Sequence, residues 1–205
     1  MSQFNNNSMR EELLKRIAMK GYSIGYAANL NFATYDIARL IPGMVTYLSL
    51  TIGILGLAWD FFTIKSISVF VLILGILSLY VEKFSFDIDS YTIIGKKHKN
   101  QLNKLEELYF LVKRNNDDSI LECASKELEA IINEFNDDSQ PKQFILFSDW
   151  FAHFKFFCQN DISWMDEEIG FKFWKHKIPQ SLKGIIILFL TTLVVFASYL
   201  WVCNR

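Results

Sequence analysis

The chain has 205 residues, of which 51% are hydrophobic and 16% aromatic, and its formal net charge is −1. This near-zero charge gives no bulk electrostatic attraction for DNA or RNA, so we expect neither as a partner. The three cysteines are scattered without a CxxC pair, which argues against a disulfide framework or a zinc site. Apolar residues are gathered into long uncharged runs, with the charged residues between them. That distribution predicts an integral membrane protein.

The first 40 residues are polar or mildly amphipathic and lack the short apolar core of a cleavable signal peptide. We predict that residues 1–40 form a cytoplasmic N-terminal amphipathic helical segment. Nineteen uncharged residues follow at 41–59, and at 1.5 Å per residue they extend about 28 Å, close to the hydrocarbon thickness of a bilayer. A second uncharged run, Ser66–Val81, comes after a very short link. The two runs predict an antiparallel two-span transmembrane hairpin over residues 41–83.

Small and polar residues share one face of the first predicted span. They are separated by steps of three, four, three and four residues: Thr46, Ser49, Gly53, Gly56 and Asp60. Small side chains let helices approach closely in lipid, so this face is suited to helix packing. In an oligomer the same face could instead line a wet pathway, with Asp60 near its mouth. The sequence leaves helix packing and pore lining both open.

Residues 84–140 are predicted to form a cytoplasmic helical hairpin. Apolar side chains recur at three- and four-residue steps in two stretches, as in amphipathic helices. The first stretch carries Leu102, Leu105, Tyr109 and Val112, and the second carries Leu121, Ala124, Leu128, Ile131 and Phe135. Asn and Asp residues at 115–118 separate the two stretches, as expected of a turn. The apolar seams are expected to meet each other or a neighbouring subunit.

A basic cluster stands just beyond the second span, at the start of the first of these helices. It consists of Lys96, Lys97, His98 and Lys99. Basic residues at this level suit contact with anionic lipid headgroups. Contact with the phosphate of a nucleotide is the alternative interpretation.

The next segment, residues 141–183, is unusually aromatic, with eleven aromatic residues between positions 144 and 174. Large rings mixed with charges suit a membrane-proximal segment in the headgroup layer. An aromatic core between helices explains the same composition, and both interpretations stay open. Residues 184–203 then form a third uncharged run, twenty residues long, which we predict to be a third transmembrane helix.

Basic residues near the ends of the spans predict the orientation in the membrane. The sides expected to face the cytoplasm carry Arg10, Lys15, Arg16, Lys20, Arg39, Lys83, Lys96, Lys97, Lys99, Lys172, Lys175, Lys177 and Lys183, against only Lys65 and Arg205 on the other side. We therefore predict a multi-pass membrane protein whose N-terminus is cytoplasmic.

The sequence contains none of the local patterns that carry common enzyme chemistry. HExxH, GxSxG and glycine-rich phosphate loops are absent, and the three histidines lie far apart. We expect no enzyme activity, no catalytic or metal-binding residues and no cofactor.

The order of these segments resembles the SLATT family, two-transmembrane effectors associated with bacterial nucleotide-signalling conflict systems. The resemblance rests on the hairpin at 41–81 and on the following helix, YTIIGKKHKNQLNKLEELYFLVKR. In that helix a histidine is followed by regularly spaced leucines and a tyrosine: His98, Leu102, Leu105, Leu108 and Tyr109. The resemblance to the family covers roughly residues 10–135. The aromatic segment and the third span depart from the minimal two-span form.

The resemblance implies an all-α membrane protein with a transmembrane helical hairpin, a cytoplasmic helical hairpin and, here, a third C-terminal transmembrane helix. It implies a homo-oligomeric, pore-forming effector of antiphage defence in the bacterial inner membrane, which depolarises the cell and causes death or growth arrest. A cyclic nucleotide, or a partner cyclase or sensor, would be the trigger. The alternative is a membrane anchor or adaptor that forms no pore and whose cytoplasmic helices recruit a soluble partner.

Overall fold

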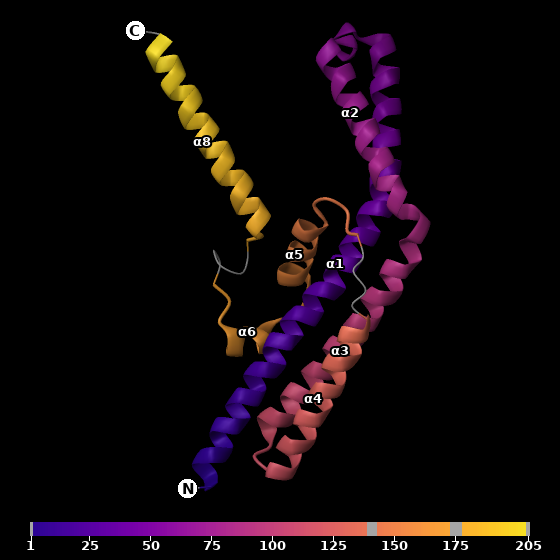
Figure 1. Cartoon of the computed structure of the whole chain (residues 1–205). Coiled ribbons are helices and arrows are strands. Elements are labelled where there is room, and N and C mark those ends of the chain that lie inside the picture. The colour runs from indigo at the N-terminus through magenta and orange to yellow at the C-terminus, as the bar shows by residue number, and fades with distance from the viewer. Residues whose placement is uncertain (1, 139–142, 173–177, 204–205) are drawn as a thin grey trace.

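The computed structural model describes residues 2–138, 143–172 and 178–203, and these residues contain helices and no strand. The helices are α1 (Ser2–Ala58), η1 (Asp60–Thr63), α2 (Lys65–Glu82), η2 (Lys83–Asp87), α3 (Ile88–Arg114), α4 (Asp118–Asp138), α5 (Ser148–Gln159), α6 (Ser163–Ile169) and α8 (Gln180–Cys203). The predicted all-α class is confirmed. Figure 1 shows a helical bundle from which two separate arms extend, one formed by the upper part of α1 with α2 and the other by α8.

Helix α1 is continuous over 57 residues and joins the polar N-terminal segment to the first span. At 1.5 Å per residue it is about 85 Å long. The boundary that we predicted between residues 40 and 41 therefore lies inside one helix. Pro42 lies within it, and the Thr46 hydroxyl donates a hydrogen bond to the Pro42 carbonyl at 2.9 Å.

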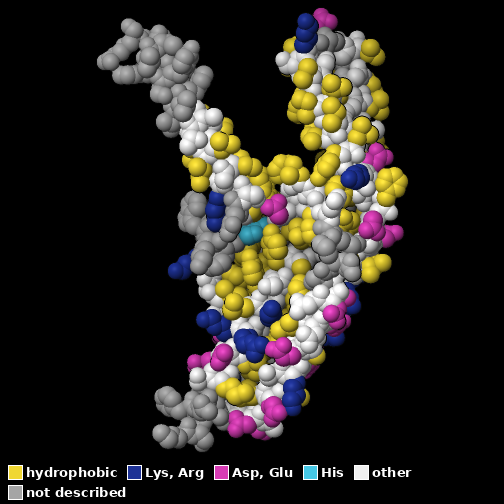
Figure 2. Space-filling view, viewed as in Figure 1, with side chains coloured by type: hydrophobic (Ala, Val, Ile, Leu, Met, Phe, Trp, Pro, Cys, Tyr) yellow, Lys and Arg dark blue, Asp and Glu magenta, His cyan; other side chains and the backbone are white. Residues whose placement is uncertain are grey.

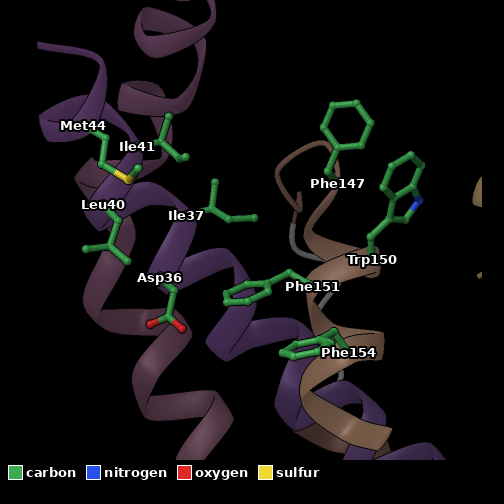
Figure 3. Close-up of a pocket in the computed structure, with 9 residues that line it drawn as sticks. All are labelled: Asp36, Ile37, Leu40, Ile41, Met44, Phe147, Trp150, Phe151 and Phe154. Carbon is green, nitrogen blue, oxygen red and sulfur yellow. The ribbon is translucent and has the colours of Figure 1, made fainter. Parts of the chain in front are cut away.

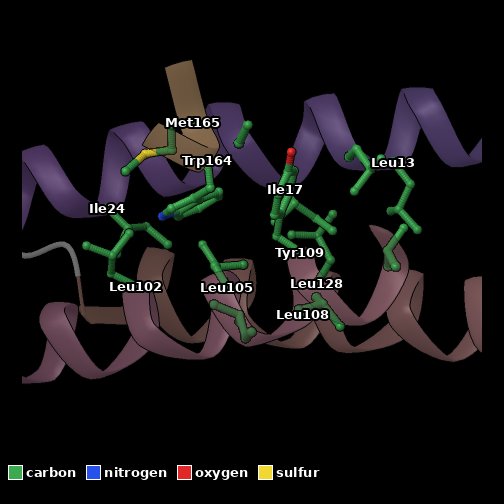
Figure 4. Packing of buried hydrophobic residues seen from close by; sticks show 14 of the residues in the cluster. Leu13, Ile17, Ile24, Leu102, Leu105, Leu108, Tyr109, Leu128, Trp164 and Met165 are labelled. Carbon is green, nitrogen blue, oxygen red and sulfur yellow. The ribbon is translucent and has the colours of Figure 1, made fainter. Parts of the chain in front are cut away.

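Helices α3 and α4 form the predicted hairpin, and both pack against the lower part of α1. The apolar seams meet each other and α1 in one core, shown in Figure 4. Its fully buried members include Ile17, Ile24, Leu105, Tyr109, Val112, Leu121 and Leu128. Arg10 Nε donates a hydrogen bond to the Val112 carbonyl at 3.1 Å, which ties the start of α1 to the end of α3.

Two glycines let α1 approach its neighbours closely. A Cβ atom at Gly21 would lie 2.5 Å from the Trp164 ring, and one at Gly25 would lie 2.9 Å from the Phe156 ring and 3.1 Å from Leu102. Real Cβ atoms essentially never come within 3.0 Å of another heavy atom, so a side chain at either position would force the Trp164 or Phe156 ring to shift.

Helices α5 and α6 lie across α1 and add an aromatic layer to the core. Phe156, Trp164 and Phe171 are buried there, and the Phe156 ring meets Tyr22 edge-on with centroids 5.3 Å apart. Other rings of the same segment, including Phe147 and Phe154, are exposed. The aromatic-core interpretation is thus correct for the buried rings, while the exposed rings remain available for a membrane surface. Phe173 and Trp174, and the basic residues Lys175, Lys177 and Arg205, lie outside the described residues.

Helix α8 begins beside α5 and then runs separately from the hairpin (Figure 1). Trp150 Nε1 donates to the Ser181 hydroxyl at 2.7 Å, and that hydroxyl donates to Asp149 Oδ2 at 2.8 Å. The apolar stretch whose side chains are described, Ser181–Leu193, is shorter than a bilayer requires. Membrane crossing by the complete α8 therefore stays a prediction.

Candidate membrane-active site

The hairpin arm consists of the C-terminal part of α1, the turn η1 and helix α2. Two helical stretches are long and apolar enough to cross a membrane, one within Asn7–Ala58 and one within Lys65–Arg114. Large apolar side chains cover the outside of this arm, and Leu57 is 90% exposed and Leu72 66% exposed. Figure 2 shows this apolar surface in yellow. Such a surface is stable only in lipid or against another protein, so the predicted transmembrane hairpin is confirmed in form.

The two helices of the hairpin meet along a regular seam. Half-buried positions recur at steps of four, three and four residues in both helices, with Leu55 and Gly75 half-buried beside them: Val45, Ser49, Ile52 and Gly56 in α1, and Ile67, Val71, Leu74 and Ser78 in α2. This spacing is typical of two helices whose side chains pack knobs-into-holes along a common seam. Within the hairpin arm, this seam is where α1 contacts α2.

The small-residue stripe that we predicted is divided between two environments. Ser49 and Gly56 are half-buried in the seam, whereas Thr46 and Gly53 are exposed on a different part of the helix surface. A Cβ atom added at Gly53 would meet nothing within 4 Å. Asp60 is exposed in the turn η1. The single chain thus leaves Thr46 and Gly53 open, and their role in packing between subunits or in pore lining stays a prediction.

The basic cluster does not form one surface. Lys96 and Lys97 are exposed, and Lys97 Nζ lies 2.7 Å from Asp138 Oδ1. Lys99 Nζ donates to Asn160 Oδ1 at 3.1 Å. His98 is only 3% exposed, with its ring 4.9 Å from that of Phe135 between centroids. The expected contact of His98 with a headgroup or phosphate is therefore not supported, because α3 turns this residue inward while its sequence neighbours point outward.

His98 is one of several buried polar side chains on α1 and α3 that sequence reasoning missed. Neither ring nitrogen of His98 has a hydrogen-bond partner among the described residues, and the same holds for Gln101 Oε1 and Asn31 Oδ1. Burial lowers the pKa of His98, Asp138 opposes this shift, and Lys97 adds to it. The neutral imidazole is thus the form that the folded bundle favours.

This burial predicts how the stability of the bundle depends on pH. The pKa of His98 is lowered in the folded protein, whereas in the unfolded chain it has its ordinary value of about 6.5. The unfolded chain therefore binds a proton at His98 more readily than the folded protein does. Neutral His98 should therefore make its whole contribution to the free energy of unfolding above about pH 6.5, and the free energy of unfolding should fall as the pH drops below that value. We expect His98→Gln to reduce the slope, measured by denaturant unfolding of the detergent-solubilised protein between about pH 7.5 and pH 5.

Lys96→Gln is the matched control, since Lys96 is exposed two residues away and should keep the wild-type slope. An equal slope in wild type and His98→Gln would contradict the prediction.

The described residues contain no group of three or more His, Cys, Asp or Glu side chains that could hold a metal ion. The arrangement as a whole is that of a membrane protein: an apolar hairpin rigidly continued into a polar helical bundle. A family model described as the SMODS and SLOG-associating 2TM effector domain 6 matches residues 8–186. The chain belongs to this SLATT family of two-transmembrane effector domains. Neither curated proteins nor solved structures give a match.

The family match extends further than the resemblance found in the sequence, which ended near residue 135. It includes α5 and α6 and stops shortly after the start of α8. The aromatic segment is therefore part of the family domain, in agreement with its packing against α1. Most of the predicted third span lies beyond the match.

Proposed function

We propose that this chain is an oligomeric, pore-forming effector of a bacterial antiphage defence system. In this proposal it permeabilises the bacterial inner membrane, depolarises the cell and causes death or growth arrest. The chain acts without catalytic residues, metal or cofactor, through a change in how its spans pack. Membership of a family of two-transmembrane effector domains carries the proposal.

The open surface at Thr46 and Gly53 supports assembly with further copies. In lipid, helices associate through close packing, and positions without a bulky side chain allow the closest approach. The seam with α2 already uses Ser49 and Gly56, so the surface left open is available to a neighbouring subunit. Asp60, exposed in the turn, would then lie near the mouth of a pathway between subunits.

The trigger that we propose is a cyclic nucleotide, bound directly or through a partner cyclase or sensor. Lys96 is exposed on the bundle and can offer a cation to phosphate, whereas Lys97 would first have to leave Asp138. Because α1 belongs to both the bundle and the hairpin, a ligand that binds one bundle arrangement more tightly would shift the packing of the spans. Because a nucleotide trigger would be cytoplasmic, the proposal places the N-terminus and the bundle in the cytoplasm, as the distribution of basic residues predicts.

The deciding experiment is a measurement of membrane potential with a voltage-sensitive dye in bacteria after induced expression of the full chain. It is run with and without a co-expressed cyclase that makes cyclic nucleotides. Rapid depolarisation in either arm supports a permeabilising effector, and a requirement for the cyclase supports the nucleotide trigger. Depolarisation absent from both arms, with membrane insertion verified, would contradict the proposal and favour the adaptor alternative.

A further inference from the structure

An apolar groove lies between α1 and α5, at the level where α1 enters the hairpin (Figure 3). Its volume is about 470 Å³, within the range of roughly 300–1,000 Å³ typical of ligand sites. Ile37, Leu40 and Met44 line it from α1, and Trp150, Phe151 and Phe154 line it from α5. Asp36 is the charged residue in the lining of the groove, and its carboxylate accepts a hydrogen bond from Lys155.

A second hollow of about 200 Å³ continues this groove toward the hairpin. The two share Ile37, Ile41 and Phe147, and the second also reaches Leu77 and Tyr80 of α2. An apolar tract therefore runs without interruption from the outer surface of the hairpin to the side of the bundle. Figure 2 shows yellow side chains between the two arms.

Phe147 stands in the wall that the two hollows share, and its backbone is unusual. Its φ is 70°, the left-handed region that bulky residues rarely adopt. This conformation belongs to a tight turn at the entry to α5, closed by the Ser148 N–H, which donates to the Ile145 carbonyl at 3.0 Å. The turn leaves the Phe147 side chain 48% exposed in the wall that the two hollows share.

We propose that the groove binds an acyl chain of a membrane phospholipid, which enters sideways from the bilayer along the hairpin. Ile41, Met44 and Leu77 belong to helices whose outer surface is suited to lipid, so the opening faces hydrocarbon and lipid is the apolar molecule present there. Water would find no hydrogen-bond partners in an apolar groove of this kind. The inference does not depend on pore formation.

The full chain is reconstituted in phosphatidylcholine vesicles that contain phosphatidylcholine with a diazirine in the middle of one acyl chain. After illumination, mass spectrometry locates the labelled residues. We expect label on Phe151 and Phe154 of α5 as well as on the lipid-facing surface of α2 around Leu72. Label confined to the spans, with α5 unlabelled, would overturn the proposal.

Two leucine substitutions on α1 separate groove binding from general surface contact. Leu40 lines the groove and Leu48 does not, and both are exposed, so neither change should impair folding. Leu40→Trp should fill the groove and reduce labelling of Phe151 several-fold, while Leu48→Trp should leave it unchanged. Equal labelling in both variants would show surface contact only and would overturn the proposal.

A photoreactive amino acid at Phe154, used in native membranes, decides between a lipid and a protein occupant. A cross-link to phospholipid supports the proposal. A cross-link to a second copy of the chain would overturn it, because the groove would then be a subunit interface.

Discussion

Replacing Gly25 with leucine is expected to destabilise the helical bundle by about 3 kcal/mol, at the upper end of the usual cost of overpacking. A Cβ atom at this position would already lie 2.9 Å from Phe156 and 3.1 Å from Leu102, so a leucine side chain would force both neighbours to shift. Folded domains are stable by only about 5–15 kcal/mol, so the loss should be large in a thermal unfolding experiment. The measurement is the unfolding midpoint of the detergent-solubilised protein, followed by circular dichroism.

Gly43→Leu is the control for this prediction, because a Cβ atom at Gly43 meets nothing within 4 Å. Leucine favours a helix over glycine by about 0.8 kcal/mol, so this variant should unfold at the wild-type temperature or above it. If Gly25→Leu and Gly43→Leu unfold at the same temperature, the close approach of α1 to its neighbours is not what stabilises the bundle.

Replacing Gly53 with leucine is expected to abolish depolarisation of the cell while the protein still inserts into the membrane. Gly53 is exposed and a Cβ atom there touches nothing, so the change should not disturb the hairpin of one chain. A leucine would instead hold a neighbouring helix away, since close packing in lipid depends on small residues. The measurement is the voltage-sensitive dye signal after induction, with insertion checked by extraction of the membranes with alkaline carbonate.

Ile54→Leu is the matched control, because Ile54 is the next residue, is exposed in the span and changes only in shape. This variant should depolarise the cell as the wild type does. Full activity of Gly53→Leu would rule out the model in which the open small-residue surface brings subunits together.

The helices could be predicted from the sequence because their signals are local. The uncharged runs have the length of a bilayer, and the stripe containing Leu102 and Leu105 repeats with the helical period whatever it packs against. The continuity of α1 across residues 40 and 41 could not be predicted in the same way. A change from polar to apolar composition marks a change of solvent, and the helix continues through it although Pro42 itself has no N–H to donate.

The candidate site was less predictable, because periodicity identifies residues on one face without identifying what that face contacts. Ser49 and Gly53 lie on one stripe, yet one faces α2 and the other faces outward. His98 was grouped with its basic neighbours, although adjacent residues on a helix point in directions about 100° apart. The groove lacks a local signal altogether, since residues 36–44 and 147–154 that line it are separated by about half of the chain.

The length of α1 has a mechanical consequence. A single rod passes through two solvents, so the bundle and the hairpin share one backbone without an intervening flexible linker. A rotation or translation of α1 between α3 and α5 would therefore also move the span. The coupling is also reciprocal: a bilayer whose thickness favours one tilt of the rod favours one arrangement of the bundle. In the proposed effector, the helix that transmits the binding of a ligand would therefore also respond to the thickness of the membrane.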